Sequence, residues 1–168
     1  VNLVAILAVF AVLLALLRSA VLPVILVLSI ETAIWLNLSL PYFTDSYVFY
    51  IAYLIISSIQ LGATVDYAIL MTTRFREEMN LGRTAKEAAQ TAVEQCSQSI
   101  LTSGLTFFAA TFSVSLVSRM ELIGSLCRLI SRGALISMAV ILLVLPALLV
   151  LTAPILKKTT FHWIQPQK

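Results

Sequence analysis

Long apolar runs, separated by short polar stretches, dominate the chain. Each run is close to or above the length of about 20 residues that an α-helix needs to cross a bilayer. The first run is the shortest, and a signal peptide is its alternative interpretation, although no basic segment precedes it. Five transmembrane helices are therefore expected, with approximate limits 1–17, 20–40, 47–73, 100–117 and 128–156.

One stretch between the third and fourth runs has the pattern of a helix in contact with water. Thr84 and Glu87 have the spacing of a capping box, in which two side chains satisfy the first backbone N–H groups of a helix. Small apolar residues then follow with helical spacing at Ala85, Ala88, Ala89, Ala92, Val93 and Cys96. The pattern predicts a short amphipathic helix over 84–96 that lies along the membrane surface or against its neighbours.

The composition agrees with a membrane domain and is incompatible with most other classes. The chain has 168 residues, of which 60% are hydrophobic and 11% are charged, whereas soluble domains have about 25% charged residues. A soluble enzyme of this size could not bury so much apolar surface. We expect an all-α membrane protein, with a helix bundle over 1–156 and a cytoplasmic tail over 157–168. Because the chain begins inside an apolar run, it is expected to be a piece of a larger protein.

The basic residues suggest an orientation. If the loop 74–95 is cytoplasmic, eight of the eleven basic residues lie inside and three lie outside, namely Arg119, Arg128 and Arg132. The positive-inside rule therefore places the C-terminus in the cytoplasm. The net charge of +3 is then explained by cytoplasmic loops, and no nucleic-acid partner is expected. Cys96 and Cys127 fall on opposite sides, so they are not expected to pair.

Asp66 is the residue of greatest chemical interest. It lies eight residues before Arg74, which is about 12 Å into a hydrocarbon layer about 30 Å thick. An ionised carboxylate at that depth costs about 2.5–3.5 kcal/mol and needs a proton, a partner or a water-filled cavity. A carboxyl group that gains and loses a proton inside the membrane suits a proton-coupled carrier. The alternative is a hydrogen-bonded packing residue of a helix bundle.

Small and hydroxylic residues surround this position. Tyr67 follows Asp66 directly and has a hydroxyl group that can donate a hydrogen bond. Gly62 lies one turn earlier on the same face, where it permits close approach of another helix. The fourth apolar run has a stripe at Ser99, Ser103, Thr106, Ala110 and Ser113. This stripe is either a packing seam or the lining of a pathway, and both interpretations can hold together.

Glu31 is a second acid inside an apolar run. It lies about 20 Å from the inner boundary, nearer to the outer face, with Trp35 and Asn37 close by as in an interfacial belt. A partnered or snorkelling residue is the favoured interpretation, and a functional role is the alternative. Gln60 is expected to form a hydrogen bond between helices.

The remaining polar candidates carry little chemistry. The charged cluster 74–78 most simply ends the third helix with ion pairs, and phosphate or lipid-headgroup binding is the alternative. His162 is the single histidine and has no ligand neighbours, so no metal site is expected. No phosphate-binding loop or hydrolase motif is present. We expect no cofactor apart from protons as the coupling ion.

Several of these motifs occur together in a specific order. They are Gly62-Ala63-Thr64-Val65-Asp66-Tyr67, then Arg74-Phe75-Arg76-Glu77-Glu78, then Ser103-Gly104-Leu105-Thr106. This combination resembles the membrane domain of the MMPL branch of the RND superfamily of proton-driven exporters. The segment 34–41 also resembles members from Gram-positive bacteria. The resemblance covers roughly residues 3–151.

The resemblance implies a larger architecture. The family has two pseudo-repeated halves of six membrane helices, each with a large extracytoplasmic domain after its first helix. This chain matches the five helices that follow such a domain. The tail suggests the C-terminal half, although the N-terminal half has a similar pattern. In the family an Asp-Tyr pair couples proton flow to substrate movement, which maps onto Asp66 and Tyr67, with Ser103 and Thr106 as hydroxylic neighbours.

The function implied is that of a secondary transporter and not of an enzyme. It would export lipids or amphiphilic compounds across a bacterial cytoplasmic membrane, driven by the proton-motive force. The expected partners are membrane lipids, the missing half with its extracytoplasmic domains, and the lipid or amphiphilic substrate. The alternative is a membrane-embedded sensor or assembly subunit, like the sterol-sensing domains of the same superfamily, in which Asp66 is structural.

Overall fold

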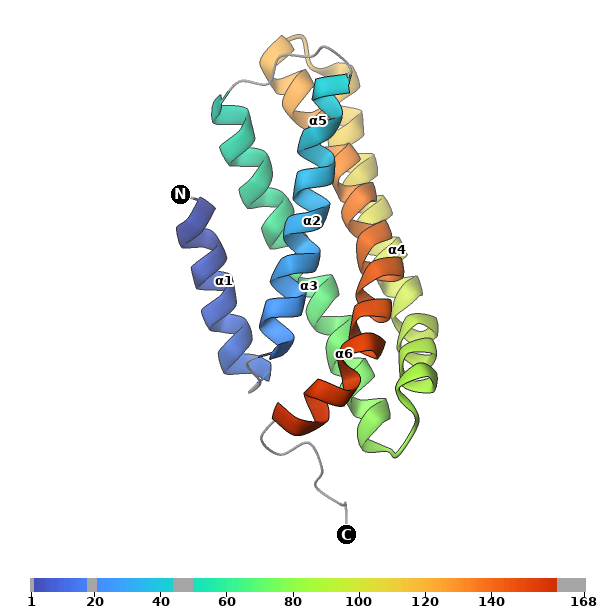
Figure 1. The fold of residues 1–168 in the computed structure, drawn as a ribbon. Coiled ribbons are helices and arrows are strands. Elements are labelled where there is room, and N and C mark those ends of the chain that lie inside the picture. Colours follow the sequence, from blue (N-terminus) through green and yellow to red (C-terminus); the bar gives the residue numbers. More distant parts are fainter. Residues whose placement is uncertain (1, 18–20, 44–49, 160–168) are drawn as a thin grey trace.

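Helices account for almost all of the residues that the structure describes. A computed structural model describes residues 2–17, 21–43 and 50–159, and no strand occurs within these ranges. The predicted all-α class is therefore confirmed (Figure 1). The elements in chain order are α1 (Asn2–Leu17), α2 (Val21–Phe43), α3 (Tyr50–Asn80), α4 (Ala85–Val117), α5 (Glu121–Ala139), the π-helix η1 (Val140–Val144) and α6 (Leu145–Thr159).

Four stretches are long and apolar enough to cross a membrane. They are Val21–Leu40, Tyr53–Asn80, Ala85–Val117 and Glu121–Pro154. The apolar part of α1, Leu3–Leu17, is shorter than the other four, so a fifth span stays a prediction. The boundary between the bundle and the expected tail is likewise untested, and residues 160–168 of that tail lie outside the described residues.

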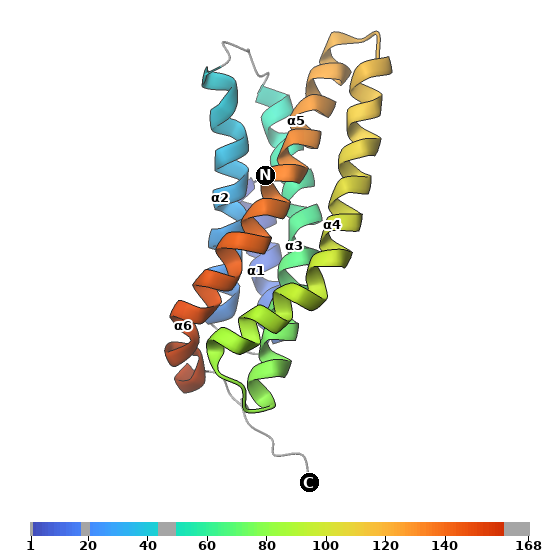
Figure 2. The ribbon, with the colours of Figure 1, turned by 90° about the vertical axis from the view of Figure 1, so that its right-hand side faces the viewer.

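The α4 helix differs from the sequence expectation. The predicted capping box is confirmed at Thr84 and Glu87, but the helix that it starts does not end near residue 96. It continues to Val117, because residues 97–99 include neither proline nor glycine and nothing breaks the backbone there. The expected amphipathic helix over 84–96 is thus the first third of α4. Figure 2 shows this part leaning across the lower end of the bundle before α4 runs beside α5.

The last apolar run forms a longer helix than the expected 128–156. It begins at Glu121 and continues past Pro146. Proline has no N–H group, and its ring clashes with the carbonyl group four residues before it. The π-helix η1 lies directly before Pro146, and there the N–H group of Leu145 bonds the carbonyl oxygen of Val140, five residues back. The wider turn accommodates the proline, as insertions of this kind do in other kinked helices.

The bundle alternates in direction along the chain, so its connections gather at two ends (Figure 1). The end of α1, the start of α2, the α3–α4 loop and the end of α6 lie at one end. The α4–α5 turn lies at the opposite end. At the first end the Arg76 guanidinium donates a hydrogen bond to the carbonyl oxygen of Leu17, at 2.9 Å, which ties α3 to the last turn of α1. Which end faces the cytoplasm stays a prediction.

Candidate functional site

Asp66 points away from the rest of the described bundle. Its side chain is exposed on α3 and makes no hydrogen bond or ion pair with any residue of the described ranges. Gly62 lies one turn earlier and is also exposed. A Cβ atom added at Gly62 would meet no atom within 4 Å. The mid-helix carboxylate therefore lies on a face of α3 that no described helix covers.

The structure brings Tyr67 and Ser103 together. The Tyr67 hydroxyl donates a hydrogen bond to Ser103 Oγ at 3.1 Å, which links α3 to α4 directly beside Asp66. Thr106 is exposed, and its hydroxyl donates to the carbonyl oxygen of Thr102 in its own helix, at 2.7 Å. Thr106 therefore has no link to Tyr67 or Asp66 among the hydrogen bonds of the described residues.

We name the exposed side of α3 and α4 the open face, defined by Gly62, Asp66, Ser99, Ser103 and Thr106. The predicted hydroxylic stripe of α4 lies on it and is exposed throughout, including Ala110 and Ser113. Among its described members, Ser103 alone hydrogen-bonds another helix, through Tyr67. The exposed apolar side chains of Ile59 and Leu70 lie one turn before Gly62 and one turn after Asp66 on α3. A face that mixes a carboxylate, hydroxyl groups and apolar residues is costly against lipid tails. The stripe is thus available to a partner helix.

A second polar group is buried between α2, α3 and α5, and we name it the amide cluster. Its members are Asn37, Gln60, Arg132, Gly133 and Ser137. Asn37 Nδ2 donates to Gln60 Oε1 at 2.9 Å and to the carbonyl oxygen of Leu129 at 3.1 Å. Gln60 Nε2 donates to Ser137 Oγ at 2.9 Å and to the carbonyl oxygen of Gly133 at 3.4 Å. The predicted interhelical role of Gln60 is confirmed.

Arg132 has a role that the sequence reasoning missed. The sequence predicts an outside charge at the start of the last helix, but Arg132 lies well inside α5 and is partly buried. Its Nη2 donates to the carbonyl oxygen of Asn37 at 3.0 Å, and its Nε donates to Asn37 Oδ1 at 3.1 Å. Pro41, four residues after Asn37, has no N–H group to bond that carbonyl group. Arg132 therefore replaces the missing helical hydrogen bond of α2.

Glu31 does not join either polar group. Its side chain is partly buried on α2, and the Trp35 side chain is within hydrogen-bond reach of the carboxylate. Its Oε1 atom is buried and has no hydrogen-bond partner among the residues that the structure describes. Trp35 itself is 71% exposed, as expected for a belt residue, whereas Asn37 is fully buried and belongs to the amide cluster instead. A functional role of Glu31 stays a prediction.

The charged cluster in the last turns of α3 forms the predicted ion pairs, and α3 continues past it to Asn80. Glu78 is buried, and its two carboxylate oxygens lie 3.1 Å from Arg74 and 3.1 Å from Arg83; the contact with Arg83 lacks hydrogen-bond geometry. Arg74 also pairs with Glu77 at 2.6 Å and bonds the side chain of Gln95. These contacts tie the α3–α4 loop to the end of α3. Removal of the two arginines would leave the buried carboxylate of Glu78 without a compensating charge, which is destabilising.

No cluster of three or more potential metal ligands occurs among the described residues. His162, the one histidine, lies outside them. The described sites therefore consist of side-chain carboxylate, hydroxyl, amide and guanidinium groups. Such groups can bind and pass protons or hold helices together, which matches the chemistry that Asp66 suggests.

Known proteins provide a separate line of evidence. The family model described as "MMPL family" matches residues 1–167. The mycolic acid-containing lipids exporter MmpL11 of Mycolicibacterium smegmatis is 29% identical over 76% of this chain and 13% of its own length. The probable transport protein MmpL11 of Mycobacterium leprae is 27% identical over 66% of this chain and 11% of its own. No solved structure matches the chain.

The chain therefore corresponds to a short part of its relatives. It spans between 10% and 13% of the length of three of them, the third being the probable transport protein MmpL9 of Mycobacterium tuberculosis, 30% identical over 56% of this chain. The match to a membrane-protein family and the apolar helices agree in making the chain part of a multi-pass membrane protein.

Proposed function

Because the chain belongs to the MMPL family, we propose that it is part of an exporter driven by the proton-motive force, with Asp66 as the proton-binding group. Lipids or other amphiphilic molecules are the proposed substrates. One relative is named a mycolic acid-containing lipids exporter, which supports this substrate class. A bacterial cytoplasmic membrane, with the C-terminus inside, is the proposed location.

The observation that carries the proposal is the position of Asp66 on the open face. The residue lies in the middle of a long apolar helix, yet its carboxylate has no partner among the described residues. An ionised carboxylate in hydrocarbon costs about 2.5–3.5 kcal/mol on insertion scales. Asp66 is therefore expected to meet polar groups of the remaining part of the protein or to be neutralised by a proton. A proton-coupling site alternates between these two situations, with the carboxylate ionised against polar groups or neutral with a bound proton.

A coupling mechanism follows from the contacts around this carboxylate. Protonation from outside removes the charge of Asp66 and weakens its attraction to polar groups that cover the open face. The Tyr67–Ser103 hydrogen bond ties the same turn of α3 to α4, and Gln60, two turns earlier, ties α3 to α2 and α5. A shift of α3 would therefore move the neighbouring helices with it. We propose that this shift drives the extracytoplasmic domains.

The experiment compares the full-length protein with its Asp66→Asn variant in proteoliposomes. Asparagine keeps the size of the side chain but cannot bind and release a proton, so proton flux and substrate export should both fall to background. Glu94→Gln, an exposed acid near the α3–α4 loop, is the matched control and should keep both activities. Undiminished export by Asp66→Asn at normal protein levels contradicts the proposal. If the protein is instead a sensor or assembly subunit, Asp66→Asn should lower the yield of folded protein, and the wild type should show no proton flux.

A further inference from the structure

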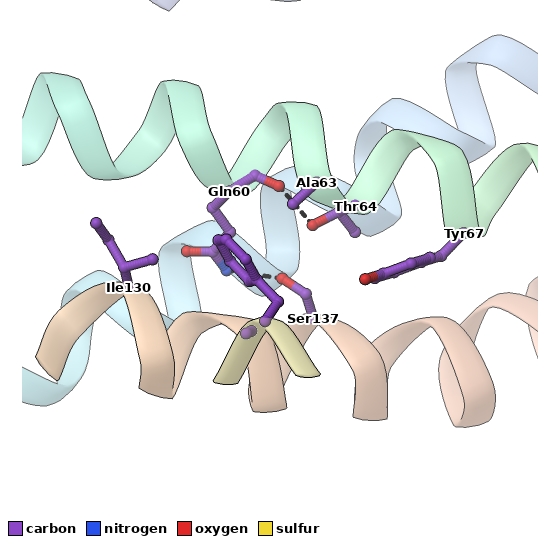
Figure 3. Close-up of a pocket in the computed structure, with 8 residues that line it drawn as sticks. Gln60, Ala63, Thr64, Tyr67, Ile130 and Ser137 are labelled. Carbon is purple, nitrogen blue, oxygen red and sulfur yellow. Dashed lines mark hydrogen bonds between the residues drawn. The ribbon is translucent and has the colours of Figure 1, made fainter. Parts of the chain in front are cut away.

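A small cavity lies directly beside the Tyr67 hydroxyl. Two helix stripes with the same spacing face each other across it, Gln60, Thr64 and Tyr67 on α3 and Ile130, Ala134 and Ser137 on α5. Ala63 of α3 and Phe107 of α4 complete the lining. Figure 3 shows the Tyr67 hydroxyl pointing along the cavity toward Ser137, which is bonded to Gln60.

The cavity has room for a water molecule. The space open to the centre of a water-sized sphere is about 10 Å³, so a water fits, and it needs two to four polar partners to stay there. Ala134 and Ala63 leave this space because their side chains are short. Purely apolar cavities stay empty, so the polar atoms on the wall decide whether water enters.

Three polar atoms on the wall have capacity for a further hydrogen bond. Ser137 Oγ accepts from Gln60 Nε2, and its own hydroxyl hydrogen has no acceptor among the described residues. The Tyr67 oxygen donates its hydrogen to Ser103 and can still accept one. Thr64 Oγ1 donates to the carbonyl oxygen of Gln60 and can likewise accept. One donor and two acceptors match the bonding capacity of a single water molecule.

We propose that this cavity binds one ordered water, which accepts a hydrogen bond from Ser137 and donates to Tyr67 and Thr64. The water joins two polar groups that are otherwise separate in the described chain. On one side are Tyr67 and Ser103 beside Asp66. On the other side are Gln60, Asn37 and Arg132 of the amide cluster, which connect α3 to α2 and α5. A continuous line of hydrogen bonds then runs from the guanidinium of Arg132 to the tyrosine of the coupling pair.

This site makes Ser137 a positioning residue for Tyr67, acting through the water. The role rests on the proposed function, because it matters for activity only if Asp66 and Tyr67 couple proton movement to export. The existence of the water site itself does not depend on that function. Its test can therefore fail or succeed separately from the test of Asp66.

The test uses the full-length protein in lipid nanodiscs. An electron cryomicroscopy map that shows other buried waters should show density within hydrogen-bond distance of both Ser137 Oγ and the Tyr67 oxygen. The density should persist in Ser131→Ala and disappear in Ser137→Ala. Ser131 is the matched control, since both serines lie buried on α5 and the Ser131 hydroxyl donates to the carbonyl oxygen of Arg128 at 2.9 Å.

A solution measurement provides the second readout. The infrared C–O stretching band of Tyr67, assigned by its loss in Tyr67→Phe, reports the hydrogen bonds at that oxygen. It should shift in Ser137→Ala and stay unchanged in Ser131→Ala. An empty cavity in such a map, or an unshifted band in Ser137→Ala, overturns the water site. Either result leaves the proposed function standing if Asp66→Asn still abolishes proton flux.

Discussion

At the scale of single residues, Gly133 shows how closely the amide cluster is packed. A Cβ atom added there would lie 2.5 Å from Asn37 Nδ2 and 2.7 Å from Gln60 Oε1. Both distances are far below normal contact, so Gly133→Ala must push the two amides apart. Overpacking of this kind costs about 1–3 kcal/mol. We predict a lower midpoint of thermal unfolding for Gly133→Ala in the full-length protein.

Gly124 on the same helix provides the control for this prediction. A Cβ atom there would lie 3.6 Å from its nearest neighbour, the carbonyl oxygen of Ser115, which is an ordinary contact. Gly124→Ala should therefore unfold at the wild-type temperature or slightly above it, because alanine favours a helix more than glycine does. Equal midpoints for the two variants would contradict the close packing of Gly133.

Residue chemistry could be predicted from the sequence only where a motif or a charge made it visible. Asp66, Tyr67 and Ser103 were identified because a carboxylate in an apolar run is unusual and because the motif order is specific. Arg132 and Ser137 were not, since an arginine near a helix end and a serine in an apolar run both have common, uninformative explanations. One signal was available: Pro41 follows Asn37 by four residues, which leaves a carbonyl group in need of a donor.

At the scale of elements, α2 and α5 are joined by the hydrogen bond from Arg132 to the carbonyl oxygen of Asn37. In Arg132→Lys the ammonium group cannot reproduce the two-point contact of the guanidinium with Asn37. We predict a loss of about 1.5–3 kcal/mol of stability, the typical contribution of a hydrogen bond to a charged group. The measurement is thermal unfolding of the full-length protein. Arg128→Lys, one turn earlier and exposed, should change nothing.

The role of Pro41 can be isolated in the same experiment. In a Pro41→Ala background the new backbone N–H group can bond the carbonyl oxygen of Asn37, so Arg132→Lys should cost less than it does in the wild type. An equal loss in both backgrounds would show that Arg132 does not compensate for the proline. A double-mutant comparison of this kind measures the coupling between the two positions directly.

Helix limits could be predicted where a polar stretch of sequence also ended the hydrogen-bonded helix. They could not be predicted where the polarity changed but the helical backbone continued. The capping box fixed the start of α4 at Ala85, because it satisfies the first N–H groups of the helix. Near residue 100 the small alanines give way to large apolar residues, which favour a lipid environment over the membrane surface. This change leaves the hydrogen-bonded backbone of α4 intact. Pro146 did not end the last helix, because the π-helix before it removes the clash.

At the scale of the whole molecule, the bundle is complete on one side and open on the other. The described core lies between α1, α2, α3, the first half of α4 and the last helix, whereas α4 beyond residue 100 buries few of its side chains. The sequence predicted an unpaired half from the family resemblance alone. Which side lacks a partner could not be predicted, because exposure depends on how the helices pack and not on their pattern of apolar residues.

The open face supplies the last prediction, for Gly62→Leu in the full-length protein. Within this chain the new side chain meets no atom within 4 Å of its Cβ, so it should not disturb the folding of these helices. If another helix approaches Gly62 closely in the complete transporter, the leucine must separate the two and remove Asp66 from its partner groups. Export in proteoliposomes should then fall at least tenfold, while the yield of folded protein stays normal. Thr32→Leu, an exposed position on α2, should export like the wild type. Full export by Gly62→Leu would mean that lipid, and not a second helix, covers the open face.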